Sequence, residues 1–149
     1  MIKGAVLNGK RRYSLWRIWD KEKPLLLYVL LNPSYADADT DDKTVVKLIK
    51  FTRNWGYGGF YLGNLHSFIT SNPKRLMHNL IPNERLNITH LEEMVKNSEK
   101  VVLGWGNAGK NPIWLKQMIS YPYCFGTNQN GSPKHPLYLS YNTTLNPYE

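Results

Sequence analysis

Residues able to carry chemistry gather in four short polar clusters. Three of them follow apolar runs, at Asn32-Pro-Ser-Tyr35, Asn64-Leu-His66 and Gly104-Trp-Gly-Asn107, and the fourth is Lys134-His-Pro-Leu137. An asparagine side chain offers a donor and an acceptor, the pair needed to read an amide-like edge such as a nucleobase. A histidine titrates near neutrality, so His135 is a candidate donor to a developing negative charge. The residue types therefore indicate recognition of a small polar group.

The same residues also have a structural interpretation. Asparagine before proline commonly bonds loop backbone, which is an alternative role for Asn32, and a buried Asn64 could do the same. His135 could simply pack within an ordered tail. Both interpretations stay open at this stage.

The acidic residues Asp37, Asp39, Asp41 and Asp42 form the other notable pattern. Hard cations take carboxylate oxygens, but the spacing lacks the glycine and distal glutamate of a calcium-binding loop. The single cysteine and the scattered histidines show no zinc-ligand spacing. We therefore expect no metal and no other cofactor, and one acid of this run could instead serve as a general base for water.

These clusters need a scaffold that brings them together, and hydrophobic periodicity predicts one. Residues 24–31 form an apolar run typical of a strand buried on both faces. Apolar residues from Val45 to Trp55 recur at helical spacing, with Thr40 or Asp41 as the expected cap. Further along the chain the patterns predict strands at 60–65, 100–105 and 121–125, helices at 83–96 and 112–120, and a long loop at 66–82.

Residues 12–19 are expected to form the outer strand, in an antiparallel hairpin with 24–31. Alternation places Tyr13, Leu15, Arg17 and Trp19 on one of its sides. The whole pattern predicts an α/β fold, a three-layer α/β/α arrangement with a mostly parallel sheet of about four core strands plus this antiparallel strand. Ligands of open α/β sheets bind at the carboxyl ends of the strands, where the polar clusters would meet.

The length and the net charge of the chain limit which partners are expected. The 149 residues predict a single domain, and the chain shows no signal segment and no long apolar stretch, so we expect a cytoplasmic protein without a membrane partner. Nineteen basic against eleven acidic residues give a net charge of +8, which suits a polyanion such as nucleic acid. The sequence does not indicate an oligomeric state.

Several short motifs in one order resemble a known family. They include Leu31-Asn-Pro-Ser34, Asp42-Lys-Thr44, Gly56-Tyr-Gly58, Trp105-Gly106 and the segment from Gly131 to Leu139. Together they resemble an uncharacterised bacterial and phage family, the domain-of-unknown-function family sixteen-forty-three, over nearly the whole chain. The family name implies no activity.

A more distant likeness is to the uracil-DNA glycosylase superfamily, on the strand ending in Asn-Pro, the strand ending in asparagine and the late His-Pro segment. It implies one glycosylase-like α/β domain over 1–149. Asn32 would position water, Asn64 would read the base edge, and His135 would stabilise the leaving base. Active members carry aspartate where Asn32 stands, so Asp37 is the nearest substitute carboxylate.

The remaining expected contacts follow from that likeness and from the four clusters. Tyr35 would stack beneath a flipped base, and the strand-end residues His66, Trp105 and Asn107 would complete the binding site. Phosphates, most naturally of DNA, would be bound by basic residues outside the crevice, namely Arg11, Arg12, Lys74, Arg75 and Lys134. Two alternatives are a hydrolase or transferase acting on free nucleotides or another small metabolite, and a noncatalytic phage or host binding protein.

Overall fold

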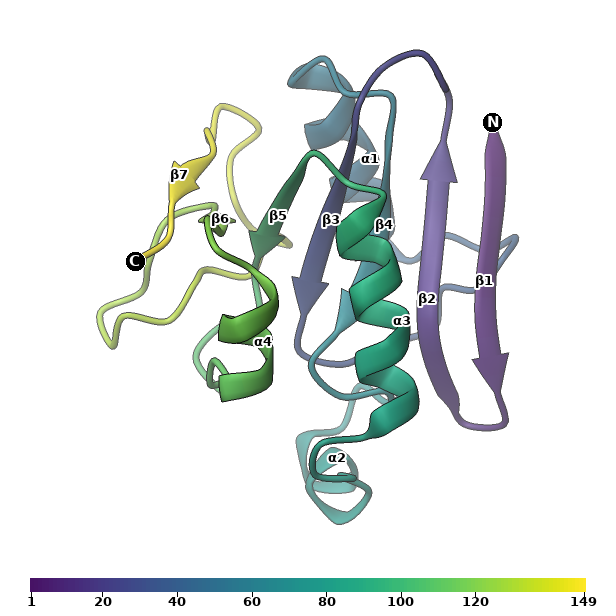
Figure 1. Cartoon of the computed structure of the whole chain (residues 1–149), viewed down its shortest axis with the longest axis vertical. Helices are drawn as coiled ribbons and strands as arrows, with labels where there is room; N and C mark the ends of the chain where they lie inside the picture. The colour runs from purple at the N-terminus through teal and green to yellow at the C-terminus, as the bar shows by residue number, and fades with distance from the viewer.

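The computed structural model describes all 149 residues and is organised on one seven-stranded sheet in the order β1-β2-β4-β3-β5-β6-β7 (Figure 1). Strands β4, β3, β5 and β6 run parallel to one another, and the other neighbouring pairs are antiparallel. The strand bounds are β1 Ile2–Asn8, β2 Arg11–Ile18, β3 Leu25–Leu30, β4 Gly59–Asn64, β5 Lys100–Leu103, β6 Tyr123–Cys124 and β7 Asn146–Pro147. The α/β class is confirmed, whereas the sheet holds more strands than expected and is mixed.

Four helices accompany the sheet: α1 Lys43–Asn54, α2 Pro73–His78, α3 Arg85–Lys96 and α4 Ile113–Met118. Helix α1 is capped by Asp42, whose Oδ1 accepts from the Val45 N–H at 2.8 Å, so the expected cap at Thr40 or Asp41 is wrong. Helix α2 lies inside the stretch expected to be a loop. Its six residues are too few to show a hydrophobic period, but Asn72 caps it and Pro73 starts it.

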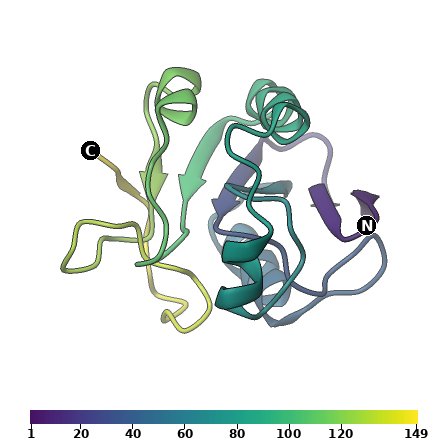
Figure 2. The same ribbon diagram turned by 90° about the horizontal axis from the view of Figure 1, so that it is seen from below.

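Alternation along β3 divides the core between the two faces of the sheet. Tyr28 packs with Phe51 of α1, while Leu27 and Val29 belong to the cluster containing Leu91 of α3. Figure 2 shows α3 and α4 on one side of the sheet and α1 on the other. At Gly63 a Cβ would lie 2.5 Å from Leu91 Cδ2, so this glycine permits close approach of α3 rather than of a ligand.

The neighbour of β2 differs from the expected one. Strand β2 pairs with β4 instead of β3, and β1 occupies the edge where β2 was expected. A Cβ at Gly59 would lie 2.5 Å from the Arg17 carbonyl oxygen, so a glycine is required where β2 crosses the start of β4. The Asn8-Gly9 pair between two short strands was the available signal for the missed β1–β2 hairpin.

A β-bulge in β2 changes which side chains face α1. Val6 pairs with Ser14 and Leu7 pairs with Arg12, so Tyr13 is the extra residue. Tyr13 stacks on His90 of α3 with ring centroids 5.5 Å apart, and the expectation that it shares a face with Arg17 is wrong. Arg12 turns instead to the side of Arg17, and both side chains bond the loop before α1.

Candidate functional site

A cavity, which we name cavity A, lies at the carboxyl ends of β3 and β4 and beside the start of α1. Figure 2 looks onto this edge of the sheet. Cavity A has a volume of about 80 Å³ over a floor of Leu30 and Leu62. Its polar lining comes from β2, from the loop after β3, from the start of α1, from the end of β4 and from the late His-Pro segment: Arg12, Asn32, Ser34, Asp42, Thr44, Asn64 and His135. The structure therefore brings Asn32, Asn64 and His135 together from three distant segments.

Asn64 is only 2 % exposed and is held at the end of β4. Its Oδ1 accepts a long hydrogen bond of 3.4 Å from Arg12 Nη2, and its backbone carbonyl accepts from Asn87 Nδ2 at 2.9 Å. Its Nδ2 donates to no protein acceptor. The amide therefore keeps a donor for a ligand in cavity A.

Asn32 has the structural role considered for it and keeps one free polar atom. Its Nδ2 donates to the carbonyl oxygens of Pro33, Phe68 and Thr70, the last at 2.7 Å, and so ties the loop after β3 to the loop after β4. These bonds fix the amide orientation and leave Oδ1 without a protein donor. Asn32 is therefore a structural residue that can still accept a hydrogen bond from water or a ligand.

His135 reaches cavity A in a defined protonation state. Its Nδ1 accepts the Leu137 backbone N–H at 3.2 Å, so the neutral ring carries its proton on Nε2. Partial removal from solvent lowers the pKa of His135, and the nearby Asp42 carboxylate offsets part of that shift. A neutral imidazole with an Nε2–H donor therefore lines the cavity near pH 7.

Arg12 is the residue whose role differs most from expectation. Its side chain is 2 % exposed, donates to the Ala36 carbonyl at 2.9 Å and leaves Nε without a partner. None of the ion pairs in the structure includes it. Burial lowers the pKa of Arg12 to about 10, Asp42 opposes this shift, and Arg17 adds to it. An incompletely paired cation therefore borders cavity A, and Arg12 is not a surface phosphate contact.

Ser34 and Thr44 were not singled out as site residues from the sequence, and Asp42 was considered only as one acid of the acidic run. Asp42 Oδ1 is used by the helix cap, while its side chain also lines cavity A. Its neighbour Asp41 is held by Arg17, whose Nε donates to Asp41 Oδ1 at 2.8 Å. The two adjacent acids at the start of a periodic helix were the only sequence signal.

Asp37 and Tyr35 do not line cavity A. Asp37 Oδ1 accepts the backbone N–H groups of Asp39 and Thr40, and these bonds lower the pKa of Asp37. Tyr35 is 69 % exposed and its hydroxyl lies 3.0 Å from Ser71 Oγ. The only carboxylate that lines cavity A is thus Asp42, and no phenylalanine, tyrosine or tryptophan ring lines it.

The other expected contacts are dispersed. Trp105 is buried against Tyr148, and the exposed Asn107 accepts a hydrogen bond from Ser132 Oγ at 3.1 Å. His66 lines a separate cavity, cavity B, which is described below. Burial lowers the pKa of His66, and a carboxylate, Glu84, opposes the shift.

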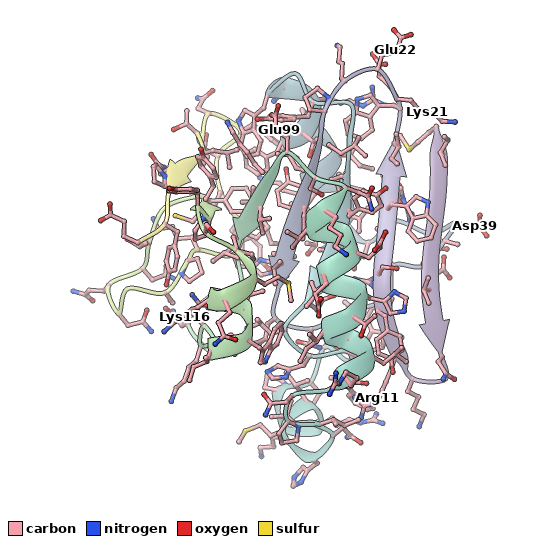
Figure 3. All side chains as sticks on the ribbon, viewed as in Figure 1. Arg11, Lys21, Glu22, Asp39, Glu99 and Lys116 are labelled. Atoms are coloured by element: carbon pink, nitrogen blue, oxygen red, sulfur yellow. The ribbon has the colours of Figure 1, made fainter.

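The basic residues divide into internal and exposed groups. Arg11 donates to Ser67 Oγ at 3.0 Å and to the Asn79 carbonyl at 2.8 Å, and Figure 3 shows it at the end of the sheet near α2. Lys74 and Arg75 are exposed on α2, and Lys134 is half-buried beside His135. The last three are available to a phosphate backbone, whereas Arg11 and Arg12 are used inside the fold.

The acidic run is organised by hydrogen bonds and an ion pair. Arg17 binds the carbonyl oxygens of Asp37 and Thr40 in addition to the Asp41 carboxylate, and Asp39 points outward (Figure 3). No group of three or more histidine, cysteine or acidic side chains is placed to hold a metal ion.

The fold and cavity A define the class as a mixed α/β protein with a polar cavity at the ends of parallel strands. The family model described as "Protein of unknown function (DUF1643)" matches residues 12–137, and the chain belongs to that family. No curated protein and no solved structure matches the chain, and the comparisons lend no support to the likeness to uracil-DNA glycosylases. None of the helices has the length and apolar character needed to cross a membrane.

Proposed function

We propose that the protein recognises a nucleobase in cavity A and hydrolyses its N-glycosidic bond, as a DNA glycosylase does. The observation that supports this most is the meeting of Asn64, His135 and the incompletely paired Arg12 around one cavity. An amide reads a base edge, while a cation and an imidazole N–H both favour negative charge. A base that departs as an anion needs both properties.

The roles follow from the free atoms. Asn64 Nδ2 donates to a carbonyl of the base, and His135 Nε2–H and Arg12 stabilise the electron pair that the base keeps when the C1′–N bond breaks. Water attacks C1′ between Asn32 Oδ1 and Asp42, and Asp42 takes the proton of the water in place of Asp37. To reach cavity A the nucleotide must leave its stack, at a cost of a few kcal/mol.

Charge supports a nucleic-acid source for this base. The net charge is +8, and the exposed Lys74 and Arg75 and the half-buried Lys134 lie on segments at the same edge of the sheet as cavity A. The alternative of a free nucleotide or another small metabolite is favoured by one observation, which is that Arg11 and Arg12 are unavailable to phosphates.

A direct test is the binding of fluorescent single- and double-stranded DNA with plain or modified bases, at low and moderate salt. We expect binding with a log–log salt slope near −0.9 per phosphate contact on duplex DNA. Asn64→Ala and His135→Ala are expected to remove the base preference and the abasic product while leaving the fold intact, because neither side chain is held by more than one long or local bond.

Asn107→Ala is the matched control, since it removes an exposed asparagine outside cavity A. The proposal would be contradicted if the affinity for DNA depended neither on the identity of the base nor on the Asn64→Ala substitution. Weak salt dependence together with tight binding of free nucleotides would favour the small-metabolite alternative.

The pH profile of turnover gives a second prediction. The pKa of His135 is lowered below its ordinary value of 6.5, so the required neutral ring predominates at pH 7. Activity should therefore stay level above pH 6.5 and fall as the pH drops through the lowered pKa. Single-turnover rates of wild type and His135→Gln check this, and an unchanged acidic limb in the variant would assign the limb to another group.

A further inference from the structure

Cavity B lies next to cavity A, on the opposite face of the sheet. Asn64 lines cavity A, while the next two residues, Leu65 and His66, line cavity B together with Trp114 of α4. Its volume is about 390 Å³, which falls in the range of roughly 300–1,000 Å³ found for small-molecule sites. The proposed reaction in cavity A uses none of its side chains.

Asn87, which lines cavity B, carries a buried side-chain oxygen without a partner. Asn87 is buried, and its Nδ2 donates to the carbonyl oxygens of Asn64 at 2.9 Å and Leu65 at 3.4 Å. These two bonds fix the amide, because the flipped orientation would set oxygen against oxygen. Asn87 Oδ1 accepts no hydrogen bond, which is unfavourable for a buried polar atom. An N–H donor that reaches this oxygen from cavity B would satisfy it.

The rest of the wall limits what that ligand can be. Trp114, Ile81 and Leu80 present apolar surface of the kind that packs on the flat face of a ring. His66 also lines the cavity, and its lowered pKa keeps the ring neutral near pH 7. Lys110 adds an exposed ammonium group, which suits a phosphate. A ligand with a flat ring, an N–H donor and an anionic group fits this wall, and a nucleotide has all three.

We propose that cavity B binds a second nucleobase, with its N–H edge toward Asn87 and its ring against Trp114. The base belongs either to the nucleotide adjacent to the one in cavity A or to a free nucleotide. Because the proposal uses no side chain of cavity A, it stands or falls separately from the glycosidic-bond reaction.

The test compares the four nucleoside 5′-monophosphates with ribose 5-phosphate, which keeps the anion and lacks the base, by calorimetric titration and by chemical shifts of the Asn87 and Trp114 side chains. We expect the monophosphates to bind and ribose 5-phosphate to bind at least about tenfold more weakly. Ile81→Arg places a large charged side chain in the cavity at a position that is already exposed, and should weaken nucleotide binding by a similar factor.

Ile113→Arg is the matched control, because Ile113 is exposed nearby on α4 but does not line cavity B. It should bind nucleotides as wild type does. A dinucleotide that binds more tightly than its monomers identifies an adjacent nucleotide as the source, and equal affinities identify a free nucleotide. The assignment would be overturned if ribose 5-phosphate bound as tightly as the monophosphates or if Ile81→Arg left the affinity unchanged. A loss of nucleotide binding in His135→Ala alone would also overturn it, by placing the ligand in cavity A.

Discussion

Arg12→Met should abolish base binding in cavity A without destabilising the protein. Burial in the folded state lowers the pKa of Arg12 to about 10, so keeping the charge at neutral pH costs on the order of 3 kcal/mol. Methionine removes that cost and fills much of the same space, although the Ala36 carbonyl loses its donor. We expect a free energy of unfolding within about 1 kcal/mol of wild type, or above it. Urea unfolding and the DNA-binding assay measure the two effects.

The adjacent arginine supplies the control. Arg11→Met breaks the bonds to Ser67 Oγ and the Asn79 carbonyl, so it should lower stability by about 1–3 kcal/mol and leave base preference in place. The opposite pattern, with Arg12→Met unstable and still selective for bases, would show that Arg12 is only structural.

Arg17→Met is expected to cause the largest loss of stability. Arg17 is fully buried and holds the loop before α1 through the Asp41 carboxylate and the carbonyl oxygens of Asp37 and Thr40. Breaking a buried pair by removing one partner typically costs about 3–5 kcal/mol. At about 2–4 °C per kcal/mol for a chain of this size, the melting temperature should fall by roughly 10 °C. Thermal unfolding followed by circular dichroism checks this.

Lys3→Ala tests whether the charge of Asp41 alone explains the effect. Lys3 Nζ lies 3.9 Å from Asp41 Oδ2 and is partly exposed, so its removal should cost less than about 1 kcal/mol. Equal losses for Lys3→Ala and Arg17→Met would mean that the loop carbonyl bonds contribute little.

Part of this site could be predicted from the sequence for a simple reason. Asn32 follows β3 and Asn64 is the last residue of β4, and these two strands are adjacent and parallel. Leu30 lies opposite Asn64 in register, so the two asparagines lie at one edge of the sheet. His135 meets them there because the late segment returns to this edge, where the Gly106 N–H bonds the Pro133 carbonyl. Strand-end geometry was sufficient for Asn32 and Asn64, whereas the place of His135 at this edge was expected only from the likeness to uracil-DNA glycosylases.

The rest depended on contacts that no local pattern contains. Asp42 caps α1 while Asp41 is held by a buried arginine from another strand, and Asp37 is used by its own loop. The predicted role of Trp105 in the binding site was wrong, because its ring packs in the core and does not line cavity A. Short elements such as α2 and β7 offer too few residues for a period to be recognised.

The extra residue at Tyr13 implies that the charge in cavity A depends on the bulge. If β2 paired regularly and kept all its residues, Tyr13 would lie opposite Leu7 and Arg12 would turn toward α3. Deleting Tyr13, by contrast, would leave Arg12 opposite Leu7 and on the side of α1. A relative in this family that lacks this one residue could therefore keep the same cation in its cavity, at a sequence position shifted by one.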